Sequence, residues 1–141
     1  MLGSPVAHSL SPVLHTAAYR ALGLDWTYTA HQIDEAGLAA FLDGLDASWR
    51  GLSLTMPLKR AVIPLLDGMS DVAAAAQAVN TVLLERDGRR VGDNTDVGGM
   101  VSAVRERTSA QIGSAAVLGA GATARSAVVA LAQLGCRAVR L

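Results

Sequence analysis

The chain has 141 residues, 51% of them hydrophobic, and its twelve basic and twelve acidic side chains cancel. This is the composition of a folded protein long enough to bury a sizeable core, and the balanced charge gives no reason to expect nucleic acid or an anionic membrane as a partner. The most apolar run, residues 115–134, is interrupted by glycines and Arg125, which excludes a membrane span. The single cysteine, Cys136, excludes an internal disulfide and fits a cytoplasmic location.

The first third of the chain predicts a helix, a strand and a second helix. Ser11 and Pro12 are typical of an N-cap followed by a first-turn proline, and Gly23 is expected to end the helix they open. Alternating β-forming residues over 26–33 predict a strand. Apolar residues at helical spacing predict a second helix over 35–45.

The middle of the chain alternates short strands and helices. The sequence predicts strands over residues 51–54, 80–85 and 89–93, and helices over 57–66 and 70–78. Asp87-Gly88, between the last two strands, is typical of a two-residue hairpin loop.

The last third predicts a helix over 97–106, a small buried strand over 114–118, a helix ending near Gly135 and the start of another strand. Strands that alternate with helices indicate the α/β class. We expect an open α/β domain over residues 1–94, a connecting helix over 95–109, and the first βαβ portion of a Rossmann-type nucleotide-binding domain over 110–141.

Both ends of the chain fall within predicted strands, so we expect a fragment of a longer protein. A sheet that ends near Val139 would have an unpaired edge, and such edges pair with other chains. We therefore expect either self-association, for example as a homodimer, or a disordered C-terminal end.

The segment Gly119-Ala120-Gly121-Ala122-Thr123-Ala124 follows a predicted strand and opens a predicted helix. Glycines there allow a tight turn and close approach of a pyrophosphate, and the helix N-terminus offers free N–H groups. The alternative is a small-residue turn that only packs closely. The acidic or basic residue that separates NAD from NADP would lie about 20 residues further on, at or beyond Leu141.

Lys59 and Asp96 are the strongest candidates for proton transfer. Lys59 follows a strand end, where ligands collect in α/β sheets, and the first turn of a helix is otherwise unfavourable for a cation. A lysine there can act as an acid or base, or hold a developing alkoxide. The alternative, which is the more common case, is a solvated lysine in the first turn of a helix. Asp96 sits between a hairpin and a helix, and its alternative role is to cap or charge that helix together with Asn94 and Thr95.

Three further polar residues are weaker candidates. Ser9 and Ser11 are hydroxyls at a helix start that could bind a carboxylate, although capping is the better explanation for Ser11 taken alone. Asn80 begins a strand, where its amide could bind a hydroxyl or serve only in a turn. His8 and His15 show no metal-binding spacing, so no metal is expected.

Five motifs, in order, resemble those of the shikimate dehydrogenase family and together cover nearly the whole chain. They are SPVAHSLSPVLH at 4–15, GLSLTMPLK at 51–59, AVNT at 78–81, GDNTDVGG at 92–99 and GAGATAR at 119–125. The departures from the family pattern, such as Gln77 for a common glycine, remove no proton-transfer group.

The resemblance implies an enzyme that reversibly reduces 3-dehydroshikimate to shikimate with NADP(H), in the cytoplasm. It implies that Ser9 and Ser11 bind the substrate carboxylate, and that Thr55 and Asn80 bind ring hydroxyls. Lys59 and Asp96 would form the proton-transfer pair. Gly119, Ala120, Gly121, Ala122 and Thr123 would bind the cofactor.

Three alternatives stay open from the sequence. A relative could act on quinate, alone or with shikimate. A chain without the rest of a nucleotide-binding domain could bind shikimate without turning it over. A different Rossmann protein, such as a methyltransferase, would explain the glycine segment but not the four motifs before it.

Overall fold

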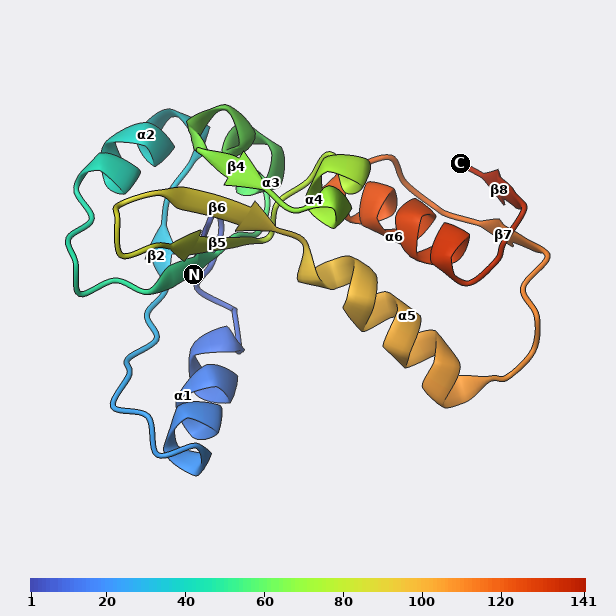
Figure 1. Ribbon diagram of the computed structural model, residues 1–141, viewed down its shortest axis with the longest axis horizontal. Coiled ribbons are helices and arrows are strands. Elements are labelled where there is room, and N and C mark those ends of the chain that lie inside the picture. Colours follow the sequence, from blue (N-terminus) through green and yellow to red (C-terminus); the bar gives the residue numbers. More distant parts are fainter.

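The structure is a computed structural model that describes residues 1–141. It has two unequal parts joined by helix α5, and the chain ends lie far apart (Figure 1). The first part contains a four-stranded sheet and the second a two-stranded one. Strands and helices alternate, so the α/β prediction is confirmed.

The larger sheet has the strand order β3–β5–β6–β4. Its strands are β3 (Gly51–Ser53), β4 (Gly68–Met69), β5 (Thr81–Leu84) and β6 (Arg90–Asp93). The predicted hairpin of β5 and β6 is confirmed, with Gly88 at a φ of +87° in its loop. Strand β4 was not predicted; it is two residues long and pairs in parallel with β6.

A parallel pair of very short strands lies beside this sheet. It consists of β1 (Leu2–Gly3) and β2 (His31–Gln32), and Leu2 also bridges to Leu54 at the end of β3. The prediction of a strand over 26–33 is therefore wrong for residues 26–30 and for residue 33. The neighbouring strand β1 offers partners to only two residues, and backbone groups without a partner form no ladder.

The helices connect the strands. They are α1 (Ser11–Ala21), α2 (Glu35–Asp43), α3 (Leu58–Ala61), the 3₁₀ helix η1 (Ile63–Leu65), α4 (Asp71–Ala76), α5 (Thr95–Arg107) and α6 (Ala122–Gln133). Helix α1 is the longest of them without a buried residue. The helix predicted over 57–66 is split into α3 and η1, because Pro64 has no N–H to continue the α-helical pattern. The alanine-rich helix ends at Ala76, earlier than predicted, where Gln77 takes a left-handed conformation.

Side-chain caps fix the starts of three helices. Asp34 accepts a hydrogen bond from the backbone N–H of Gly37, Ser70 caps α4 in the same way, and Asn94 caps α5. The prediction that Ser11 caps α1 is wrong. Leu10 occupies the cap position, and the Oγ of Ser9 accepts the backbone N–H of Ser11 at 3.2 Å.

Two separate buried clusters form the core. The larger one holds ten residues under the four-stranded sheet, among them Leu38, Leu42 and Val82. The smaller one, Ala76, Ala78, Val97 and Ala130, lies where α4, α5 and α6 meet. Figure 1 shows α6 running between α4 and the two-stranded sheet of the second part, hereafter called the small sheet, with α5 beside it.

The small sheet pairs β7 (Ser114–Ala116) in parallel with β8 (Ala138–Arg140). Strands were predicted at both places, over residues 114–118 and at the end of the chain. The prediction of a buried strand is wrong: the ends of β7 are exposed, and Leu118 is 99% exposed. A two-stranded sheet covered by one helix leaves much of its surface uncovered.

Candidate active site

Lys59 and Asp96 form an ion pair across 37 residues of sequence. The Nζ of Lys59 donates to Oδ2 of Asp96 at 2.6 Å, and the two side chains are 13% and 24% exposed. Lys59 is the only lysine in the chain. A charged pair held this far from solvent loses hydration on both sides, so it needs close geometry and further hydrogen bonds to be stable.

Asn80 supplies those further bonds. Its Nδ2 donates to the second carboxylate oxygen of Asp96 at 2.7 Å, and its Oδ1 accepts the backbone N–H of Thr95 at 2.9 Å. The hydroxyl of Thr81 also donates to the Oδ1 of Asn80, at 3.0 Å. Each oxygen of Asp96 is thus held by a different side chain, and the carboxylate is fixed in orientation.

The β5–β6 hairpin brings these residues together. Its register pairs Thr81 with Asp93, which places Asn80 beside the first residues of α5. Lys59 is tied to the same place, because its carbonyl accepts the backbone N–H of Val79 at 2.7 Å. The predicted proximity of Lys59, Asn80 and Asp96 therefore follows from backbone pairing.

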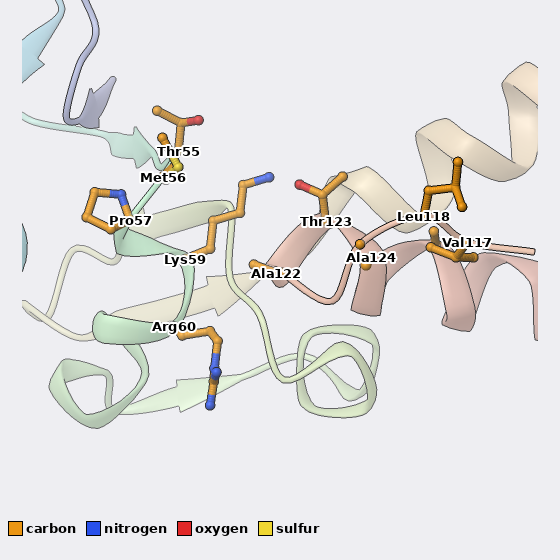
Figure 2. A pocket seen from close by; sticks show the side chains of 13 residues that line it. Thr55, Met56, Pro57, Lys59, Arg60, Val117, Leu118, Ala122, Thr123 and Ala124 are labelled. Carbon is orange, nitrogen blue, oxygen red and sulfur yellow. The ribbon is translucent and has the colours of Figure 1, made fainter. Parts of the chain in front are cut away.

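A cleft of about 470 Å³ opens between Lys59 and the start of α6 (Figure 2). One wall is made of Thr55, Met56, Pro57, Lys59 and Arg60, and the other of Val117, Leu118, Gly119, Gly121, Ala122, Thr123, Ala124 and Ala127. Figure 2 shows Lys59 pointing towards the side on which Thr123 lies, whereas Arg60 points away from it.

The glycine segment has the features of a phosphate-binding turn. Gly119 has a φ of +117°, which favours glycine, and Gly121 occupies the cap position of α6 without any side-chain cap. A Cβ added at Gly119 or Gly121 would meet nothing within 4 Å, so open space adjoins both. Uncapped N–H groups at a helix start beside open space fit the pyrophosphate of a dinucleotide. Ala120 is not part of the cleft wall.

Ser9 and Ser11 do not contact the Lys59–Asp96 pair. The Oγ of Ser9 accepts the backbone N–H of Ser11, and α1 projects from the first part of the molecule, apart from α6 (Figure 1). His15 has a structural place: its Nδ1 is 3.0 Å from the carbonyl oxygen of Ser11, and its ring stacks on Tyr28 at 4.1 Å.

Sequence reasoning missed several residues of this region. Thr95 lies next to Asp96 in the same motif and could have been included on that ground. Nothing in the sequence pointed to Arg60 in the cleft wall, or to the bond from Arg125 to the side chain of Gln77. No group of three or more His, Cys, Asp or Glu residues is placed to hold a metal ion. No helix combines the length and apolarity needed to cross a bilayer.

Comparison with known proteins gives the same picture. The family described as the shikimate dehydrogenase substrate binding domain matches residues 1–82. A shikimate dehydrogenase (NADP(+)) of Moorella thermoacetica is 45% identical over 138 residues, covering 96% of this chain and 46% of that protein.

Two solved structures extend this comparison. The shikimate 5-dehydrogenase of Thermus thermophilus, in complex with NADP(H) and shikimate, is 41% identical with a TM-score of 0.90, over 98% of this chain and 53% of that one. A 5-ketofructose reductase of Gluconobacter is 32% identical with a TM-score of 0.86, over 98% of this chain and 50% of that one.

Fold and site define a class of α/β protein in which a polar, ion-paired site faces a dinucleotide-type glycine turn across a cleft. Within that class, the chain belongs to the shikimate dehydrogenase family. It spans about half the length of the curated relatives it matches.

Proposed function

We propose that the protein carrying this chain is an NADP-dependent oxidoreductase that interconverts 3-dehydroshikimate and shikimate, in the biosynthesis of aromatic amino acids. The observation that carries the proposal is the Lys59–Asp96–Asn80 hydrogen-bonded group, in which Lys59 lines a cleft opposite the glycine turn. Proton-transfer residues and a dinucleotide site on opposite walls of one cleft are what a ketone reductase requires.

The chemistry of this group suits reduction of a ketone. When the carbonyl carbon gains hydride, negative charge develops on its oxygen. The ammonium group of Lys59 stabilises that charge and supplies the proton that completes the hydroxyl. Asp96 holds the ammonium group in place through its short ion pair, and Asn80 holds Asp96. In the reverse direction, neutral Lys59 accepts the hydroxyl proton.

The remaining proposed contacts are assigned by the family motifs. Thr55 lies in the cleft wall with Lys59 and would bind a ring hydroxyl together with Asn80. Ser9 and Ser11 would bind the substrate carboxylate, and helix α1 would have to face the substrate for this to hold.

NADP(H) would lie against the glycine turn and supply the hydride. Residues Gly119, Gly121, Ala122 and Thr123 line the cleft and would hold its phosphates, with Ala120 as the residue between the two glycines of the same turn. The structure of the Thermus thermophilus shikimate 5-dehydrogenase is a complex with NADP(H) and shikimate, which supports the choice of this cofactor and substrate.

The wider organisation is also proposed. Residues 1–94 would form the substrate-binding domain, 95–109 the connection and 110–141 the start of the nucleotide-binding domain. The family match over 1–82 and the larger buried cluster, whose ten residues all lie between Leu2 and Val82, support this division. A cytoplasmic location and a homodimer complete the proposal. The single free cysteine supports the location, and the uncovered small sheet supports the homodimer.

A second candidate is a reductase of different or broader ketone specificity, such as one that also accepts quinate. The similarity to a 5-ketofructose reductase favours keeping this alternative, because a close fold relative is named for another ketone. It predicts comparable turnover of two substrates, whereas the main proposal predicts a preference for shikimate.

We expect shikimate with NADP⁺ to yield NADPH in a continuous absorbance assay, with quinate and NAD⁺ both slower. We also expect shikimate to raise the thermal unfolding midpoint of the 141-residue chain more than quinate does, since a ligand that binds only the folded state stabilises it. A midpoint shift without turnover in the longest natural form would indicate a binding protein. Equal turnover of quinate would favour the second candidate. The absence of both a midpoint shift and turnover with shikimate would refute the proposal.

A further inference from the structure

Asn94 and Ser126 are the only buried polar side chains in the structure. They are 3% and 0% exposed, and the Nδ2 of Asn94 donates to the Oγ of Ser126 at 2.9 Å. The same nitrogen donates to the carbonyl oxygen of Ala78 at 2.8 Å, and the Oδ1 of Asn94 caps α5 through Val97 at 3.2 Å. One amide therefore joins three segments that are distant in sequence.

These bonds connect the two walls of the cleft. Asn94 lies two residues before Asp96, at the start of α5. Ser126 lies in the first turns of α6, directly after the glycine turn, where its hydroxyl is 3.4 Å from the carbonyl oxygen of Ala122. The distance between the Lys59–Asp96 pair and the glycine turn thus depends on the position of α6 relative to Asn94.

The apolar packing around this bond is weakly directional. The fully buried side chains of the adjoining cluster are three alanines and Val97, which are small and have little shape to interlock. Larger side chains pack against this cluster only partly buried: Val72, Met100, Val101 and Val129. A buried hydrogen bond is directional, and its loss leaves a donor without a partner. A second link lies beside it on the surface, where Arg125 donates to the side chain of Gln77, next to Ala78.

We propose that Asn94 and Ser126 are positioning residues, whose hydrogen bond sets the placement of the glycine turn relative to Lys59 and Asp96. The proposal rests on the function proposed above. It assigns these two side chains no contact with substrate. Their effect on turnover comes from holding the two reacting partners at the correct separation, because small misplacements of reacting groups lower rates steeply.

Ser126→Ala removes the acceptor and little volume. We expect it to lower kcat for shikimate roughly 10- to 100-fold, while the KM for shikimate, whose proposed site lies on the other wall, stays nearly constant. Ser102→Ala is the matched control, because Ser102 is an exposed serine on α5 with no side-chain hydrogen bond. Should Ser126→Ala lose its cooperative unfolding transition, Ser126→Cys, which keeps a weakly accepting atom there, is expected to show a smaller loss of kcat.

A second measurement does not depend on turnover. Cys136, the only cysteine, follows α6, and Ala39→Cys adds an exposed site on α2, at the far end of the molecule (Figure 1). Spin labels at both positions report the distance between the two parts. We expect a broader distance distribution in Ser126→Ala than in the parent protein or in Ser102→Ala.

The two measurements separate the possible failures. A parent protein without shikimate turnover would refute the proposed function, and the distances would still decide whether the bond sets the placement of α6. An unchanged distribution would overturn the inference. So would a broadened distribution with unchanged kcat, or a rise in KM equal to the fall in kcat.

Discussion

Replacement of Lys59 by alanine is expected to lower kcat for shikimate oxidation by about a thousandfold. The reason is that the ammonium group both stabilises the charge on the reacting oxygen and exchanges its proton. The KM for shikimate should change far less, because other groups would bind the carboxylate and the ring hydroxyls. Steady-state kinetics of the longest natural form, with each substrate varied in turn, measures both constants.

Arg105→Ala is the matched control for charge removal. Arg105 is exposed in the last turn of α5 and forms no ion pair, so its loss removes one positive charge far from the cleft. The control should keep kcat within about twofold, since exposed charges are screened beyond about 10 Å. A Lys59→Ala protein with intact kcat and a raised KM would show that the lysine only binds substrate.

Asp96→Asn should lower kcat by roughly a hundredfold. An amide at this position can still accept from Asn80, but it carries no charge to hold the ammonium group of Lys59. Lys59 would then take up other rotamers, and the proton donor would be out of reach for part of the time. The loss should be smaller than for Lys59→Ala, because the donor itself is retained.

Asp71→Asn tests the simpler explanation that Asp96 serves only its helix. Asp71 is an exposed acid in the first turn of α4, so it interacts with a helix dipole as Asp96 does but contacts no lysine. We expect no change in its kinetics and a small loss of thermal stability. Equal effects of the two substitutions on kcat would remove Asp96 from the proton-transfer group.

Local sequence features predicted most of the elements in the chain. The hairpin at Asp87-Gly88, the helix ended by Gly23 and the glycine turn before α6 each depend on a few adjacent residues whose conformational preferences are strong. The failures lie where a distant partner decides. Residues 26–30 have β-forming side chains but no neighbouring strand, and β4 forms only because β6 is available beside it.

The candidate site shows the same division. The pairing of Lys59 with Asp96 was predicted from motifs, and the hairpin register explains why the two meet. The bond between Asn94 and Ser126 could not be predicted in this way. It joins a helix cap to a helix interior, and each residue has an ordinary local role without the other.

A titration of isotope-labelled Lys59 with shikimate, followed by nuclear magnetic resonance, tests directly whether Lys59 belongs to the substrate site. Because Lys59 is the only lysine, selective lysine labelling gives a single side-chain signal from the site. We expect shikimate to shift this signal in a saturable way, with a Kd equal to the one obtained from thermal denaturation at varied shikimate concentration, and quinate to shift it less. Stabilisation by shikimate without any change in the Lys59 signal would place the ligand elsewhere and refute the proposed role of Lys59.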